Sequence, residues 1–192
     1  MHCLSTLFLS AILLLPAFAY SDENKVNPVV ILHTSKGDIH VELYADKSPI
    51  TVENFLDYVR SGFYDGTIFH RVIRRFAVQG GGLNPDLVEK ANDADPIINE
   101  SKLNRLSNDR WTIAMARTED PNSARSQFYF NMALNMDLDA RMGRDGYAVF
   151  GKIIEGRNVV RDISVTPTHK VAGHSDVPKE AVILINASIK KP

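Results

Sequence analysis

The sequence predicts a mostly β domain, either a closed barrel or a sandwich, with two helices that would cover the open ends of a barrel. Short apolar or alternating runs, roughly eight of them, recur between turn residues along most of the chain. Only two segments space their apolar residues as an amphipathic helix does. The 192 residues, 44% of them hydrophobic, suffice for one domain with its own core.

The first 19 residues are expected to be a secretory signal. Leu4 to Phe18 is an apolar run of about 15 residues, short of the roughly 20 that span a bilayer. Ala17-Phe18-Ala19 has the small-x-small form of a cleavage site, although no Lys or Arg precedes the run. An uncleaved anchor is the alternative. We therefore expect a signal over 1–19, a polar leader over 20–27 and the domain over 28–192, with no stable membrane insertion after cleavage.

The single cysteine and the charge balance exclude several classes of protein. Cys3 would leave with the signal, so the remaining chain would have no disulfide, no cysteine nucleophile and no cysteine-ligated zinc. The formal net charge of −1 argues against nucleic acid as the main partner.

The first elements follow from alternation and then from helical spacing. Strands are predicted at Val29–Leu32 and Ile39–Leu43, around a Ser-Lys-Gly-Asp turn. A helix is predicted from Ser48, which can act as its cap, to Gly62, which can end it. Its apolar residues keep i, i+3, i+4, i+7 spacing, which implies packing against a sheet: they are Val52, Phe55, Leu56 and Val59.

Two further strands surround the first chemically interesting residues. Thr67–Ile73 reads as a strand, in which Phe69, Arg71 and Ile73 would share one face. Phe76–Gln79 reads as the next strand, and three glycines then end the pattern.

The remaining elements lie beyond a long polar loop over 84–108. Gly156–Ser164 has apolar residues at helical spacing and predicts a second, short helix. Four more strands are predicted, at Trp111–Ala116, Gln127–Met132, Tyr147–Ile154 and Ala181–Ile189.

Familiar catalytic motifs are not found. The six histidines are scattered, and there is no His-Glu-x-x-His, Gly-x-Ser-x-Gly or Walker sequence. The carboxylate pairs lie in polar loops, where solvated turn residues are the simpler interpretation. We therefore expect no metal and no cofactor, and infer either a binding protein or an enzyme that makes and breaks no covalent bond.

Four motifs together resemble the cyclophilin family of peptidyl-prolyl cis-trans isomerases. They are the Phe-His-Arg-Val-Ile to Gln-Gly-Gly run at 69–81, Met-Ala-Arg at 115–117, Ser-Gln-Phe-Tyr at 126–129 and Tyr-Ala-Val-Phe-Gly at 147–151. The residues around the second and fourth motifs are most similar to those of the bacterial periplasmic branch. This similarity agrees with the expected export to the periplasm. The resemblance implies a closed eight-stranded antiparallel barrel capped by two α-helices, with a substrate groove on its outer face.

The resemblance also implies a site. Arg71 would be the catalytic residue and Gln79 would bind the substrate backbone. Phe76, Tyr129 and Leu138 would wall a proline pocket. The remainder of the groove would be lined by Ala116, Arg117, Gln127 and Tyr147. The implied partners are proline-containing exported polypeptides, unfolded or extended, and the implied state is a monomer. A prolyl-peptide binding or holdase protein with little turnover is the alternative.

The chain departs from the family pattern around this site. Arg74 and Arg75 stand where the usual turn is Pro-Gly, and Asp137 stands where relatives have Trp or Phe. Ala77 replaces Met, and Tyr129 replaces Phe, which adds a hydroxyl near the pocket. An acidic group at the rim is expected to weaken the binding of apolar ligands.

Overall fold

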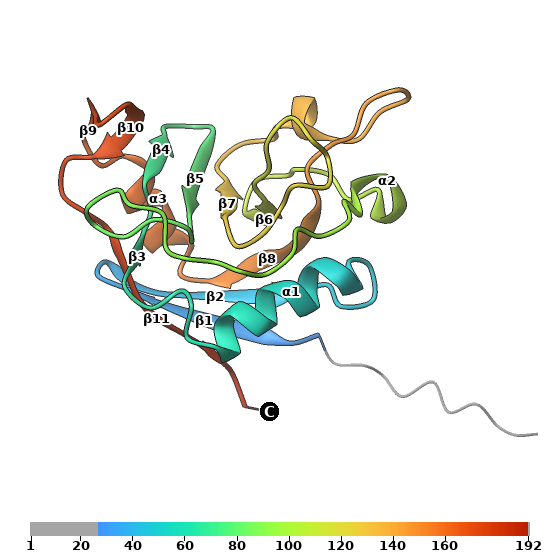
Figure 1. Cartoon of the computed structure of the whole chain (residues 1–192), viewed down its shortest axis with the longest axis horizontal. Helices are drawn as coiled ribbons and strands as arrows, with labels where there is room; N and C mark the ends of the chain where they lie inside the picture. Colours follow the sequence, from blue (N-terminus) through green and yellow to red (C-terminus); the bar gives the residue numbers. More distant parts are fainter. Residues whose placement is uncertain (1–26, 192) are drawn as a thin grey trace, which may run out of the picture.

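The computed structural model describes residues 27–191 (Figure 1). The predicted signal and most of the predicted leader lie outside them. The strands are β1 (Val29–Thr34), β2 (Gly37–Leu43), β3 (Thr67–Ile68), β4 (Arg71–Ile73), β5 (Ala77–Gly80), β6 (Thr112–Met115), β7 (Phe128–Asn131), β8 (Val149–Glu155), β9 (Thr168–Val171), β10 (His174–Pro178) and β11 (Ile183–Ile189). The helices are α1 (Pro49–Arg60), α2 (Ser101–Asn104) and α3 (Arg157–Ser164), with a 3₁₀ turn, η1, at Met136–Leu138.

Nine of the strands form one antiparallel sheet, in the order β3-β11-β1-β2-β8-β6-β7-β5-β4. This confirms the mostly β, antiparallel class, but the expectation of a closed eight-stranded barrel with two helices needs correction. The two end strands, β3 and β4, do not pair with each other: β3 pairs with β11 and β4 with β5. They are consecutive in the chain, separated only by Phe69 and His70. The sheet is therefore curved, and the chain itself links its two edges without ladder hydrogen bonds.

The interruption at Phe69 and His70 also changes which residues share a face. The predicted strand Thr67–Ile73 placed Phe69 with Arg71, yet Phe69 is 1% exposed and belongs to the main core. Because β3 ends at Ile68 and β4 begins at Arg71, the two-residue period does not continue across the gap. Arg71 and Ile73 remain partly exposed, while Val72 between them is buried.

Helix α1 forms as its spacing predicts, but another residue caps it. It buries Val52, Phe55 and Leu56, and packs against β11. Ser48 is the N-cap residue, but its hydroxyl donates to the carbonyl of Val149 at 2.8 Å instead of accepting from the helix. The carboxylate of Glu100 accepts from the Thr51 amide (2.8 Å), so a long-range contact supplies the cap.

The aromatic core lies between α1 and the sheet. The ring of Phe55 contacts those of Tyr64, Phe128 and Phe150, with centroids 5.2–5.5 Å apart. All four side chains are fully buried. Rings in tilted and edge-on contact add stabilisation beyond the area that they bury. This packing supports the inner face of the strands whose outer face forms the site.

Two small features were not predicted. The β9–β10 hairpin packs against β4, and its residues are mostly polar and exposed, so the sequence shows little alternation there. Helix α2, only one turn long, lies in the segment predicted as loop. Within the described residues, no helix is long and apolar enough to cross a membrane.

Candidate active site

The register of three neighbouring strands places the predicted catalytic and binding residues in one row. Arg71 on β4 pairs with Gln79 on β5, and Gln79 pairs with Tyr129 on β7. Directly opposed residues point to the same face of a sheet, at a Cβ separation of about 5 Å. The row therefore results from the pairing of segments that lie far apart in the sequence.

These residues surround a hollow of about 240 Å³. A cavity of this size suits one small side chain, since sites for drug-sized ligands are larger, at about 300–1,000 Å³. Eight of the nine predicted site residues line it, and Ala77 joins them: the lining is Arg71, Phe76, Ala77, Gln79, Ala116, Arg117, Tyr129, Leu138 and Tyr147.

The ninth predicted residue, Gln127, lies in an adjoining hollow of about 370 Å³. The two hollows share Gln79, Ala116 and Arg117. The amide of Gln79 donates to Oε1 of Gln127 at 3.0 Å, which links them. The two hollows together form a continuous groove.

Two arginines reach the first hollow, and they differ in how their donors are used. The guanidinium of Arg117 lies 4.4 Å from the ring centre of Tyr147 and donates to the carbonyls of Asp145 (2.9 Å), Gly146 (3.2 Å) and Thr118 (2.8 Å). The N–H donors of the Arg117 guanidinium are therefore already bonded to backbone carbonyls.

Arg71 is not engaged in this way. The only hydrogen bond of its side chain within residues 27–191 is a long one, 3.4 Å, from Nη1 to Oε1 of Gln79. It forms no ion pair with a described carboxylate, and the side chain is partly exposed. Arg71 consequently presents a permanently charged group with uncommitted N–H donors to the hollow.

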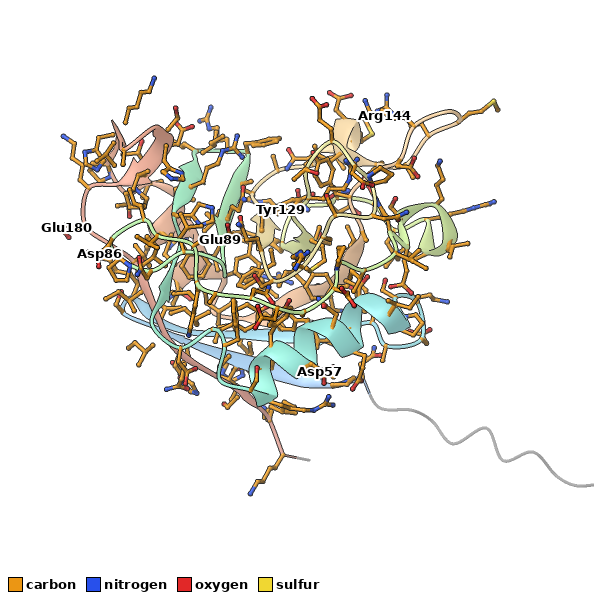
Figure 2. All side chains as sticks on the ribbon, in the orientation of Figure 1. Asp57, Asp86, Glu89, Tyr129, Arg144 and Glu180 are labelled. Atoms are coloured by element: carbon orange, nitrogen blue, oxygen red, sulfur yellow. The ribbon has the colours of Figure 1, made fainter. Side chains whose placement is uncertain are left out.

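The hydroxyl of Tyr129, expected near the pocket, is bonded elsewhere. It donates to Oδ1 of Asn108 at 2.7 Å, and burial raises the pKa of the Tyr129 hydroxyl well above its usual value. Tyr129 lies in the interior of the molecule (Figure 2), with 5% of its surface exposed. The hollow is thus walled by its ring, as a phenylalanine would wall it.

The sequence reasoning missed the residues behind this wall. Asp139 Oδ1 accepts from the backbone amide of Asn108 at 2.7 Å and from its side-chain amide at 3.0 Å. Asn135 donates to the carbonyl of Phe76 at 2.9 Å. These polar residues lie in stretches that read as loops, and nothing local distinguishes them from solvated ones.

A larger hollow, of about 490 Å³, lies between α2 and the 139–143 segment. None of the predicted site residues lines it, and two of its cations are paired, Lys102 with Asp145 and Arg141 with Asp137. No group of three or more His, Cys, Asp or Glu residues in the described part of the chain is placed to bind a metal ion.

Comparison with known proteins identifies the family. Residues 29–189 match the model of the cyclophilin type peptidyl-prolyl cis-trans isomerases. A peptidyl-prolyl cis-trans isomerase of Acinetobacter baylyi is 49% identical over 164 residues, which cover 85% of this chain and 86% of the relative. Peptidyl-prolyl cis-trans isomerase B of Escherichia coli is 45% identical over 167 residues, 85% of this chain and 100% of the relative.

The structures agree with the sequences. The crystal structure of a cyclophilin type peptidyl-prolyl cis-trans isomerase from Cryptosporidium parvum superposes with a TM-score of 0.75 at 28% identity, covering 86% of this chain and 99% of that one. The same isomerase, crystallised in the presence of the dipeptide Ala-Pro, superposes with a TM-score of 0.73. The antiparallel sheet, the sequence match along nearly the whole described chain and the solved relatives agree: the chain belongs to the cyclophilin type peptidyl-prolyl cis-trans isomerases.

Proposed function

We propose that this isomerase accelerates X-Pro rotation in exported, unfolded or extended polypeptides, and that Arg71 is its catalytic residue. The observation behind this assignment is the contrast between the two arginines of the hollow. Arg117 uses its donors to hold neighbouring carbonyls, whereas Arg71 makes one long hydrogen bond and has donors left for a substrate.

The reaction requires no bond to be made or broken. Amide resonance keeps the X-Pro bond planar, with a rotational barrier of about 18–20 kcal/mol. When the bond twists, the nitrogen lone pair is no longer shared with the carbonyl and becomes a hydrogen-bond acceptor. A guanidinium N–H near that nitrogen therefore stabilises the twisted form and gives little to the planar one, which is differential binding of the transition state.

The size of this effect limits what Arg71 can do alone. A charge-assisted hydrogen bond contributes about 1.5–3 kcal/mol, or roughly a 10- to 100-fold rate increase. Two further contributions are available in the groove. An apolar wall formed by Phe76 and Leu138 favours the less polarised, twisted amide, and anchoring the backbone at Gln79 lets only one side of the bond turn.

Substitution of Arg71 tests this assignment. Arg71→Ala should lower kcat/KM for an Ala-Pro peptide by about 10- to 100-fold in an NMR exchange assay, with peptide affinity changed much less. Arg71→Lys keeps the positive charge but not the paired N–H donors of the guanidinium, so an intermediate rate is expected. Arg161→Ala, an exposed arginine on α3 outside the groove, is the matched control and should behave as the wild type.

The same assay separates catalysis from simple binding. If this were a prolyl-peptide holdase with little turnover, Arg71→Ala would reduce affinity and exchange rate by the same factor. A fall confined to the exchange rate supports the isomerase mechanism.

Export and assembly are proposed on other grounds. The apolar segment over 4–18 and the Ala17-Phe18-Ala19 sequence support secretion to the periplasm and cleavage after Ala19. N-terminal sequencing of the protein recovered from the periplasmic fraction should begin at Tyr20; an intact Met1 in the membrane fraction would refute cleavage. Light scattering during size-exclusion chromatography should give the mass of a monomer.

A further inference from the structure

Arginines are concentrated on the hairpin that forms one side of the active site. Arg71 lies on β4, and Arg74 and Arg75 form the turn that leads to β5. Both turn arginines are exposed, and Phe76, the next residue, lines the first hollow. Figure 1 shows this turn at the upper end of β4 and β5. The hairpin that supplies Arg71 and Phe76 to the hollow therefore has three positive charges in one short stretch.

These charges are not neutralised by the rest of the described chain. No hydrogen bond or ion pair joins the side chain of Arg74 or Arg75 to another residue within 27–191. Two acidic residues of neighbouring segments do not pair with these arginines. Asp137, which precedes Leu138 of the first hollow, is paired with Arg141 at 3.3 Å, and Asp176, on the β10 strand that packs against β4, forms no ion pair with them. Arg60, which is also exposed, differs because it pairs with Glu53 at 2.6 Å.

The backbone of the turn is unfavourable for the residue that it holds. Arg75 has φ = 60°, in the left-handed region that glycine occupies at least cost. Elsewhere in the described chain such φ values occur at glycines, as at Gly81 (83°), and at other residues, as at Leu87 (61°) and Asp176 (61°). The conformation at Arg75 is therefore not unique to this turn, but it has a local cost that a glycine would avoid.

The turn is also held firmly against the site. The amide of Phe76 donates to the carbonyl of Ile73 at 3.0 Å, which closes the turn. The carbonyl of Phe76 accepts from the Met132 amide and from the Asn135 side chain, both at 2.9 Å. The second hollow meets the first at Gln79, whereas the turn adjoins the Phe76 wall. A peptide with its proline in the first hollow would thus have a neighbouring residue beside the turn.

We propose that Arg74 and Arg75 recognise a carboxylate side chain of the client polypeptide, close in sequence to the proline that is isomerised. Guanidinium groups match carboxylates in charge and in the geometry of their paired donors. The inference rests on the proposed role of the first hollow and extends it from proline alone to proline with an acidic neighbour. An exposed ion pair contributes little, so the preference is expected to be modest and sensitive to salt.

The test uses matched peptides in an NMR exchange assay with the full chain. Hexapeptides with one central proline and otherwise alanine have Glu, Gln or Lys placed two residues before the proline, or one or two residues after it. For the wild type, kcat/KM at low salt should be about 2- to 5-fold higher for Glu than for Gln in at least one placement. The Lys peptide should be the poorest, and about 1 M salt should remove the difference.

Three variants decide whether the turn is responsible. In Arg74→Gln with Arg75→Gly, the Glu-to-Gln ratio should fall to about one, and the melting temperature should rise because Gly relieves the strain at φ = 60°. In Arg74→Glu with Arg75→Glu, the Lys peptide should become the best substrate. Lys36→Gln with Lys190→Gln removes two exposed charges outside the groove and should leave the ratio unchanged.

A Glu-to-Gln ratio of one in the wild type at every placement would overturn the proposal. So would an unchanged ratio in the first variant. Failure of the proposed function can be told apart from failure of this proposal. If the assignment of Arg71 is wrong, Arg71→Ala will turn over all peptides normally. The turn variants keep Arg71, so they should alter only the ranking of the peptides.

Discussion

The hydroxyl of Tyr129 donates a 2.7 Å hydrogen bond to Oδ1 of Asn108, an asparagine with no exposed surface. The same oxygen accepts from the side chain of Asn131 at 3.1 Å, and the two amides of Asn108 donate to Asp139. Asp139 directly follows Leu138, so one buried asparagine joins two walls of the first hollow, the ring of Tyr129 and the segment of Leu138.

Removal of this asparagine should affect both stability and turnover. Asn108→Ala leaves the Tyr129 hydroxyl without its acceptor and removes one hydrogen bond to Asp139, which keeps those from Ser107 and from the backbone amide of residue 108. The free energy of unfolding should fall by about 2–4 kcal/mol in urea titration. Turnover at saturating peptide should also fall, since the Tyr129 ring is less well positioned. Asn84→Ala, which removes an asparagine that bonds only within its own loop, is the control.

A double-mutant cycle separates positioning from general loss of stability. If Asn108 acts on catalysis through the Tyr129 hydroxyl, Asn108→Ala should cost less kcat in a Tyr129→Phe background than in the wild type. Additive losses of kcat would mean that the network is structural only.

The cap supplied by Glu100 should be the main polar contribution to the start of α1. Its carboxylate, 3% exposed, accepts from the hydroxyl of Thr51 at 2.6 Å and from the amides of Thr51 (2.8 Å) and Ile50 (3.2 Å). Glu100→Gln keeps the size but removes the charge and one acceptor, so unfolding should become about 2–3 kcal/mol easier. Glu53→Gln, on the exposed face of the same helix, should cost well below 1 kcal/mol.

The buried histidine of the first motif should make the fold sensitive to acid. Burial, with a smaller effect of nearby His174, lowers the pKa of His70 to about 4, and its Nδ1 has no hydrogen-bond partner among the described residues. The unfolded chain, with an ordinary histidine pKa, therefore binds a proton that the folded one does not between about pH 6.5 and 4. Stability is complete above this window and decreases as the pH falls through it.

Chemical unfolding at two pH values measures this contribution. Between pH 7 and pH 5 the wild type should lose about 2 kcal/mol through His70, and His70→Asn should lose correspondingly less. His169→Asn, at an exposed histidine on β9, should keep the wild-type dependence. An identical pH dependence in His70→Asn would show that other groups cause the acid sensitivity.

Gly82 lies directly against the side chain of Gln127. A Cβ at residue 82 would lie 2.5 Å from Cγ and 2.8 Å from Nε2 of Gln127, so Gly82→Ala must displace that side chain. The hydrogen bond from Gln79 would then be disturbed (3.0 Å in the native fold), and KM should rise several-fold with little change in kcat.

The effect of Gly82→Ala on KM should disappear when the side chain of Gln127 is absent. In a Gln127→Ala background, Gly82→Ala should not raise KM further, because the clash is gone. A further rise would mean that Gly82→Ala acts through the backbone of the glycine run instead.

The sequence predicted most of the elements because their signals are local. The spacing of Val52, Phe55, Leu56 and Val59 predicted α1, and alternation predicted the strands on either side of Gly37. The four motifs indicated the family, and eight of the nine residues assigned through them line a single hollow. The roles of these residues are predictions.

The errors arose where long-range packing overrides local pattern. Phe69 was assigned to the face of Arg71, but the strand is interrupted so that Phe69 can pack among the core aromatic rings. Ser48 was expected to cap α1, but Glu100 does so, and the sequence does not show that these distant segments meet. The β9–β10 hairpin was missed because its polar residues do not alternate.

The sequence by itself determined the class of fold, the family and the residue types available for chemistry. Apolar periodicity and the order of the motifs are local properties that can be read directly from the sequence. Only the tertiary structure decided which arginine has free donors, where the Tyr129 hydroxyl points and that the side chains of Arg74 and Arg75 have no partner within residues 27–191. These properties depend on hydrogen bonds between residues that are distant in sequence, and such bonds exist only once the sheet has brought them together.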